Sequence, residues 1–180
     1  MGGVVAVRRL GIIVAFGALL GLFAGVVTAV PALAGGRGPR WQFEPAGPET
    51  LPADRCGFAV DVNPVANKGF VKELKGSDES FVILSTGTFK ESFTNVGTGN
   101  TITENMGGPA TVTFFPDGSV TSKLRGLIGM FLAPADAARF GLPPVSVTAG
   151  LVTISFDAAG NITSLSLTGH VRVDVCAALS

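Results

Sequence analysis

Apolar and polar residues alternate with a period of two over most of the chain after residue 56. This is the pattern of β-strands that bury one face. In residues 81–93, Phe and Ile keep one phase across Ser85 and Gly87, which predicts a long strand bent in its middle. Turn sequences such as Pro116-Asp117-Gly118 separate these segments. We therefore expect an all-β domain of about eight strands, paired with their sequence neighbours as an antiparallel meander.

The alternation places apolar residues on one face of each strand and Thr or Ser on the other. Such a sheet either closes into a small barrel or forms a two-sheet sandwich, and the barrel is the first expectation. Within residues 145–156 the apolar phase changes from odd to even positions. A one-residue bulge at Ala149-Gly150 is predicted to restore the inward face.

Helical signals are sparse. Residues 134–140 begin with Pro and stop at Gly141, the asymmetry typical of a short helix. A second helical turn is expected near residues 67–75. Residues 35–55 are rich in Gly and Pro and are predicted to be a linker, so that the domain itself spans residues 56–180.

The N-terminal segment has the three parts of a secretory signal peptide. Arg8 and Arg9 precede an uncharged run from Leu10 to Val30, and Ala32-Leu33-Ala34 forms a cleavage site. We expect residues 1–34 to be removed after Ala34 and the protein to be exported. The alternative is a retained anchor, since 21 apolar residues are long enough to cross a bilayer as a helix.

The charge and cysteine content of the chain bear on which molecules it binds and on the compartment in which it works. The chain carries 13 basic and 13 acidic residues, and removal of the two arginines of the signal leaves 11 − 13 = −2. This near-neutral charge gives no electrostatic case for nucleic acid or for an anionic membrane surface.

Cys56 and Cys176 are the two cysteines. An even count in an exported protein predicts that they form a disulfide.

Glu91 and Glu104 are the candidate catalytic residues. Each stands in phase with the apolar face of its strand. If residues 97–100 form the hairpin loop, the two carboxyls become diagonal neighbours about 7 Å apart. One pKa would then rise, as general acid catalysis requires. A loop of another length, or strands that splay into water, would remove the pairing.

Other chemistry is weakly supported. His170 is the single histidine, and its phase puts it on the outer face with Arg172 and Asp174. The sequence lacks a His/Cys cluster for a metal, and Gly97 and Gly99 lie in an expected turn, not before a helix that could bind phosphate. We therefore expect neither a metal nor a cofactor.

Three stretches carry a resemblance to known sequences. They are the loop Thr94-Asn95-Val96-Gly97-Thr98-Gly99, the turn Pro116-Asp117-Gly118-Ser119, and the ending from Gly169-His170-Val171 to Cys176-Ala177-Ala178-Leu179. Together they resemble an uncharacterised family of small secreted proteins from high-GC Gram-positive bacteria, over most of residues 56–179. The resemblance implies a bacterial, extracytoplasmic setting and transfers no activity.

Three classes of function follow from these features. The first is a binding module that holds a small apolar molecule, because Ser85 and Gly87 leave space on a Phe-rich inner face. The second is an interaction protein of the cell envelope, tethered by residues 35–55. The third is a cofactor-free enzyme using Glu91 and Glu104. Binding or interaction is expected over catalysis, with membrane contact only if residues 1–34 are retained.

Overall fold

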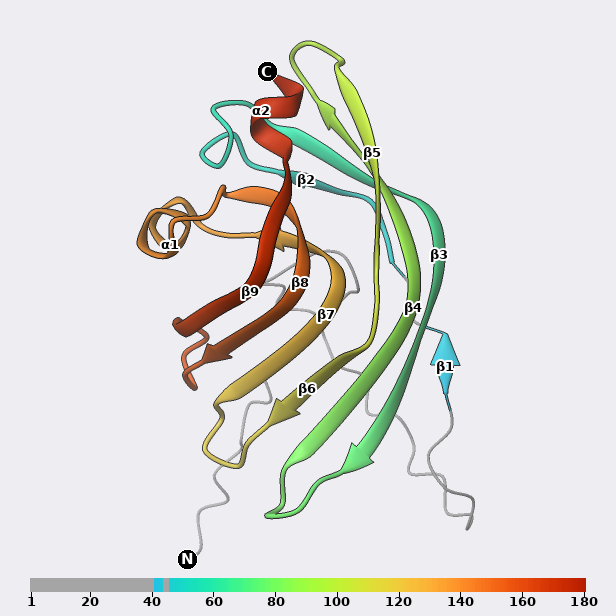
Figure 1. Ribbon diagram of the computed structural model, residues 1–180, viewed down its shortest axis with the longest axis vertical. Coiled ribbons are helices and arrows are strands. Elements are labelled where there is room, and N and C mark those ends of the chain that lie inside the picture. Colours follow the sequence, from blue (N-terminus) through green and yellow to red (C-terminus); the bar gives the residue numbers. More distant parts are fainter. Residues whose placement is uncertain (1–40, 44–45) are drawn as a thin grey trace, which may run out of the picture.

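The computed structural model describes residues 41–43 and 46–180, and the predicted signal segment with its cleavage site lies outside them. The described residues form nine antiparallel strands and two short helices (Figure 1). The elements are β1 (Gln42–Phe43), β2 (Glu49–Leu51), β3 (Val60–Lys75), β4 (Phe81–Asn95), β5 (Thr101–Gly107), β6 (Ala110–Phe114), β7 (Val120–Phe131), α1 (Pro134–Phe140), β8 (Val145–Phe156), β9 (Ile162–Asp174) and α2 (Val175–Leu179). The all-β antiparallel class and the short helix at 134–140 are confirmed.

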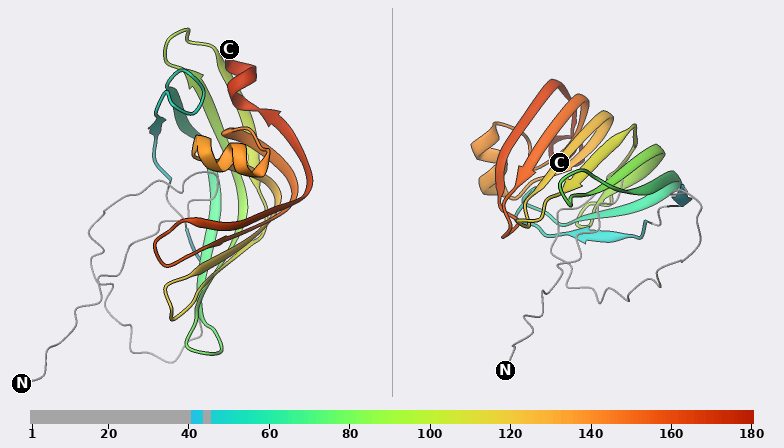
Figure 2. Two further views of the ribbon diagram at one scale, coloured as in Figure 1. Left: turned by 90° about the vertical axis from the view of Figure 1, so that its left-hand side faces the viewer. Right: turned by 90° about the horizontal axis from the view of Figure 1, so that it is seen from below.

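The strands form one curved sheet in the order β1-β3-β4-β5-β7-β8-β9, while β2 pairs with β3 and β6 pairs with β4 and β7. Among the described residues no strand pairing joins β9 back to β1, β2 or β3. The expected barrel closure is therefore not formed, and the sheet is an open, half-wrapped one (Figures 1 and 2). Its concave side faces α1.

A row of glycines crosses the sheet where the strands bend. It consists of Gly69, Gly87, Gly107, Gly126, Gly150 and Gly169, which face or adjoin one another on successive strands. Five of the six have positive φ, between 113° and 151°. A side chain on Gly169 would collide with the Ala149 carbonyl, and the other positive-φ members of the row meet neighbouring backbone in the same way. Only glycine permits this conformation and this close approach, so the row allows the sheet to curl.

The side chains of the sheet form two apolar cores. The upper core, near α2, contains Leu51, Val60, Val62, Phe89, Phe93, Met106, Phe131, Val145, Val147, Val175 and Leu179. The lower core contains Val112, Val120, Ile128, Met130, Leu132, Ala137, Val152, Ile154, Phe156 and Ile162. Because β2–β5 and β7–β9 both contribute to the upper core, this half is two-layered, and the sandwich alternative fits it.

Strand β8 explains the change of apolar phase that the sequence contains. Its pairing with β7 runs without interruption from Val145 to Phe156, so the predicted bulge at Ala149-Gly150 is wrong. Val145 and Val147 enter the upper core, whereas Val152, on the opposite face, enters the lower core. All residues from 145 to 148 are buried, since both faces of the strand are covered there. The phase changes because the sheet exchanges its buried face, not because the strand gains a residue.

Two further expectations are corrected by β3. Residues 67–75 are not helical but belong to this strand, where they pair with the first part of β4. The predicted linker is not wholly a linker, because β1 and β2 lie within it and both pair with β3. Leu51 is buried in the upper core. Short strands next to Pro and Gly carry too few residues for their alternation to be recognised from sequence.

Candidate functional site

Glu91 and Glu104 lie on the same face of the β4–β5 hairpin and directly opposite each other. The predicted diagonal arrangement was wrong by two residues of register, because Thr94 pairs with Thr101. The cause is Asn95. Its side-chain oxygen accepts hydrogen bonds from the backbone N–H groups of Gly97 and Thr98, so the strand pairing ends at Thr94, two residues earlier than expected.

Glu91 is the most deeply buried carboxyl of the site, with 3% of its surface exposed. It alternates with Phe89 and Phe93, two members of the upper core. Its Oε2 atom has no hydrogen-bond partner. Burial raises the pKa of Glu91 to about 8, and the charge of Glu49 adds to this rise. At neutral pH the side chain is therefore predominantly a neutral acid inside an apolar core.

Glu49 is the acidic neighbour that sequence reasoning missed. It lies on β2 opposite Val62, one strand beyond the β3–β4 pair. Burial raises the pKa of Glu49, while the positive charge of Arg55 acts in the opposite direction. Its Oε1 atom is buried without a hydrogen-bond partner. The only sequence signal was an acidic residue two positions before Leu51, and the expected linker concealed it.

Glu104 has a different environment, because it forms an ion pair with Arg172. The Arg172 Nη2 and Glu104 Oε2 atoms are 3.7 Å apart. The register of the β8–β9 pairing shifts between the pairs Val147–Val173 and Thr148–Val171. Arg172 is the extra residue of β9 at this shift and has no pairing partner on β8. This bulge turns Arg172 away from the outer face on which the alternation placed it. Glu104 thus has a positively charged partner, whereas Glu91 has none among the described residues.

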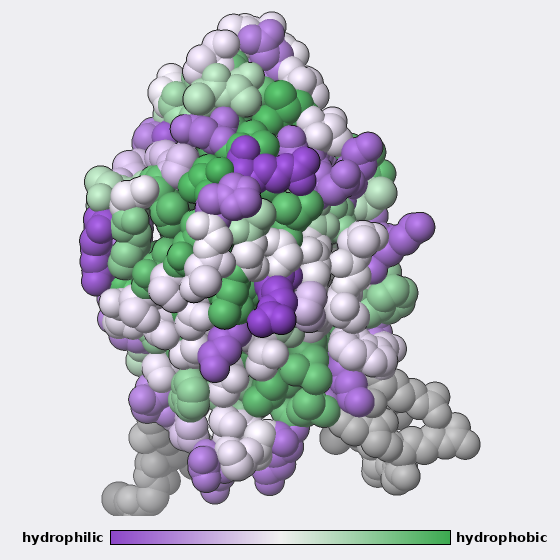
Figure 3. Space-filling view, in the orientation of Figure 1, coloured by the Kyte–Doolittle hydropathy of each residue, from purple (hydrophilic) through white to green (hydrophobic). Residues whose placement is uncertain are grey.

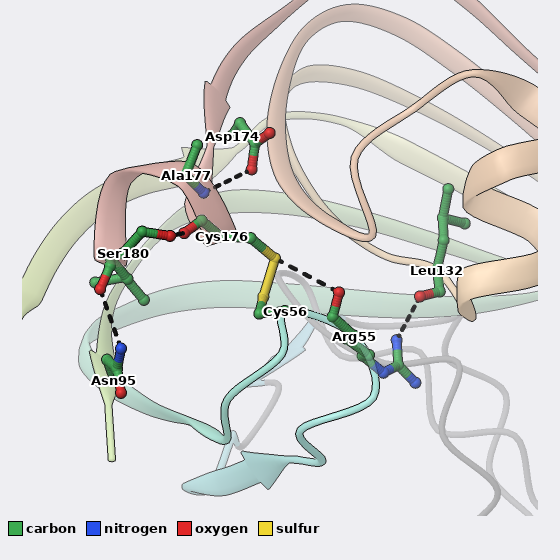
Figure 4. The surroundings of a disulfide bond; sticks show 9 residues. Arg55, Cys56, Asn95, Leu132, Asp174, Cys176, Ala177 and Ser180 are labelled. Atoms are coloured by element: carbon green, nitrogen blue, oxygen red, sulfur yellow. Dashed lines mark hydrogen bonds between the residues drawn. A yellow bond between two sulfur atoms is a disulfide. The ribbon is translucent and has the colours of Figure 1, made fainter. Parts of the chain in front are cut away.

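The disulfide holds the C-terminal end of the chain beside this hairpin (Figure 4). Cys56 is bonded to Cys176, as predicted, across 120 residues of sequence. Asp174 caps α2 by accepting a hydrogen bond from the Ala177 backbone N–H. The Asn95 side chain donates to the Leu179 carbonyl at 3.1 Å. The loop that sets the Glu91–Glu104 register is therefore anchored to α2.

Arg55 links the same end of the sheet to the start of the α1 connection. Its Nη1 atom donates to the Leu132 carbonyl at 3.1 Å, and its own carbonyl oxygen lies 3.9 Å from the Cys176 sulfur (Figure 4). The guanidinium is thereby held near Glu49 by a backbone contact. This arrangement keeps a positive charge near Glu49.

His170 does not join the site. It is exposed on β9, opposite Ala149. Within the described ranges 41–43 and 46–180, His, Cys, Asp and Glu side chains form no group of three suited to a metal ion. No helix in that part of the chain is long and apolar enough to cross a membrane.

A second candidate region is the concave face below the glycine row. One row of paired residues places apolar side chains on β4, β6, β8 and β9, with Ser122 of β7 between them; its apolar members are Ile83, Val112, Ile154 and Leu165. The opposite face of these strands is rich in Thr and Ser.

This concave face is less completely covered toward the outer ends of β4 and β6. Phe81 packs against Phe114, with ring centroids 5.9 Å apart, yet remains 40% exposed, and Phe115 is 41% exposed. Figure 3, which looks mainly onto the convex side of the sheet, shows a further apolar patch toward the lower ends of the strands. The lower core thus continues into an accessible aromatic rim.

Comparisons with models of protein families, with curated proteins and with solved structures find no match to this chain. The structure and the chemistry of its residues therefore carry the functional argument.

Proposed function

We propose that this protein is a secreted binding module that holds a small apolar molecule against the concave face of its sheet. The observation that carries the proposal is the apolar lower face, which ends on the exposed rings of Phe81 and Phe115. Exposed aromatic rings that border a buried apolar core can bind a small apolar ligand, because binding removes the apolar surfaces of the rings and of the ligand from water. The half-wrapped sheet leaves this aromatic rim exposed at the outer ends of β4 and β6.

Export is part of this proposal and has two supports. One is the Cys56–Cys176 disulfide, since such bonds persist in oxidising, extracytoplasmic compartments. The other is the signal peptide predicted for residues 1–34. The intact mass of the protein recovered from culture fluid tests both features. We expect a chain that begins at Gly35 and has lost two hydrogens to the disulfide.

Ligand binding can be tested with N-phenyl-1-naphthylamine, an apolar probe whose fluorescence rises when it leaves water. We expect a saturable rise with the wild-type protein. Phe114→Ala should weaken binding about tenfold, since one aromatic contact surface is lost. Thr113→Ala is the matched control, because Thr113 is its chain neighbour and lies on the opposite face of β6. Equal affinity in both variants would contradict the proposed location.

Native mass spectrometry of the protein purified from its own source gives an independent result. A bound mass that leaves on denaturation supports the binding module and provides a molecule to identify. If neither a bound mass nor saturable probe binding is found, the proposal fails.

We also propose a second candidate, a cofactor-free enzyme that transfers a proton through Glu91. The specific observation in its favour is a nearly buried acid, directly opposite Glu104, with a pKa raised to about 8. A carboxyl that titrates near neutral pH suits general acid or base catalysis. Carboxyl titration followed by NMR tests this requirement. Ordinary pKa values for both groups would remove the enzyme candidate.

A further inference from the structure

The convex face of β3 and β4 carries positive charges that have no negative partner in the described part of the chain. Lys68 and Lys72 lie on one face of β3, and Lys90 lies on the same face of β4, two residues beyond the Thr88 that pairs with Lys68. None of the three lysines forms an ion pair or side-chain hydrogen bond with another described residue. Among the described strand residues on this face of β3–β7, Asp61 is the one carboxylate.

Asp61 is too far away to neutralise these lysines. It lies seven residues before Lys68 on β3, on the far side of the bulge at Pro64–Ala66. Seven residues of strand span about 23 Å. Asp61 pairs with Thr94, four residues beyond Lys90 on β4, which is a separation of about 13 Å. Both distances exceed the screening length of about 8 Å at physiological ionic strength. The near-neutral net charge of the chain therefore conceals a local excess of positive charge.

Exposed aromatic rings lie among these lysines. Phe70 stands between Lys68 and Lys72 on the same face of β3 and is 44% exposed. Phe43 of β1 pairs with Phe70, and their ring centroids are 6.4 Å apart in an edge-to-face contact. Phe43 is 56% exposed and Trp41, two residues earlier, is 48% exposed. Figure 1 shows β1 outside β3, at the edge of the sheet.

We propose that this surface, the cationic aromatic patch formed by Trp41, Phe43, Lys68, Phe70, Lys72 and Lys90, docks on a membrane of anionic phospholipids. Lysines are attracted to the negative headgroups, while exposed Trp and Phe rings partition into the interfacial layer. A purely electrostatic partner would leave three large aromatic rings in water. A lipid membrane can bind both the lysines and the aromatic rings of the patch, because its anionic headgroups and its apolar layer lie within one side-chain length of each other.

This docking surface is distinct from the concave face of the proposed function and does not depend on it. The apolar-ligand site lies on the other side of the same sheet. Docking through the convex side would leave that site accessible while the protein is at a membrane.

Trp41 provides a direct assay, because it is the single tryptophan of the chain. Its emission is followed as vesicles of phosphatidylglycerol, or of phosphatidylcholine, are added at low salt. We expect a blue shift and co-sedimentation with the anionic vesicles alone, both reversed at high salt. The apolar segment 10–30, if retained, would bind either lipid, so lipid selectivity separates its contribution from that of the patch.

The triple variant Lys68→Gln, Lys72→Gln and Lys90→Gln should bind anionic vesicles about 100-fold more weakly, because each lysine contributes about a fivefold gain. Lys75→Gln is the matched control, since Lys75 lies on the opposite face of β3 and should bind as wild type does. All chains compared carry the same N-terminus. Circular dichroism and the intact disulfide verify that the triple variant is folded.

Three results would overturn the proposal. The first is equal binding to both kinds of vesicle, and the second is an equal loss in the Lys75→Gln control. The third is binding to soluble polyphosphate without binding to anionic vesicles, which would identify the surface as a site for an anionic polymer. None of these results bears on probe binding at the concave face, so the two proposals fail separately.

Discussion

Replacing Glu91 by Gln is expected to stabilise the protein at neutral pH and to leave its stability at pH 5 nearly unchanged. Glutamine has almost the shape of the protonated acid but cannot ionise. The variant therefore removes the cost of a buried carboxylate while keeping a polar group of the same size in the upper core.

The magnitude follows from the difference in proton affinity between the folded and unfolded states. The pKa of Glu91 is about 8 in the folded protein, against an ordinary value of 4.5. Between these values the folded chain retains a proton that the unfolded chain has released. The stability contributed by the neutral acid is fully present below pH 4.5 and is lost as the pH rises toward 8. The loss is about 1.4 kcal/mol per pH unit, or about 3 kcal/mol at pH 7.

Urea unfolding at pH 5, 6, 7 and 8, without reductant, measures this effect. The free energy of unfolding of the wild type should fall across the series, and that of Glu91→Gln should fall less. At pH 7 the variant should be about 3 kcal/mol more stable, equivalent to roughly 10 °C in Tm. The reduced slope need not be zero, because the pKa of Glu49 is raised as well.

Glu79→Gln, at an exposed turn, is the control and should follow the wild-type profile. A wild-type stability that is flat from pH 5 to pH 8 would refute the reasoning. So would equal slopes for the wild type and Glu91→Gln, since the proton linkage would then lie elsewhere.

Three other substitutions test the framework of the fold. Cys56→Ser combined with Cys176→Ser should lower the free energy of unfolding by about 2–4 kcal/mol, measured by denaturant titration, because the unfolded chain regains the entropy of a long loop; a loss that persists when both proteins are reduced would contradict this. Gly169→Ala should lower the free energy of unfolding, measured by thermal denaturation, by about 3 kcal/mol or more, because the new side chain would collide with backbone and the φ of residue 169 is +151°. Gly47→Ala, with open space around it, is the control and should leave the stability unchanged. Asn95→Ala should cost about 1–3 kcal/mol and increase amide hydrogen exchange in α2, since the Leu179 carbonyl loses its 3.1 Å donor and keeps only the 3.5 Å contact from the Asn100 side chain. Unchanged exchange there would show that the Asn95 contact is dispensable.

The expected strand bend at Gly87 and the short helix at 134–140 show what local pattern can determine. Both depend on residues whose preferences act within a few positions: glycine at a bend, and proline and glycine at the two ends of a helix. The alternation of apolar residues likewise predicted the antiparallel meander, because it depends only on which side chains avoid water. The disulfide followed from the number of cysteines and the expected compartment.

The carboxyl site could be predicted only in part. The in-phase positions of Glu91 and Glu104 indicated that both would lie on the inner face, as they do. Their exact pairing depended on the hydrogen bonds of the Asn95 side chain, which change the loop length by a contact that alternation does not encode. Glu49 approaches Glu91 only because β2 adds to the far side of β3, a long-range pairing of a three-residue strand.

Local sequence pattern therefore specifies where strands and turns occur, and which side chains of each strand prefer an apolar neighbour. How the faces of the strands meet depends on the folded chain as a whole. The glycine row lets the sheet curl until β8 buries opposite faces in two cores, so the phase change near Ala149 marks an exchange of cores and not a bulge. Likewise, the lysines and aromatic rings of β1, β3 and β4 become one surface only when the strands are paired. Strand alternation is set by covalent geometry within a few residues, whereas register and curvature are set by contacts between residues far apart in the chain.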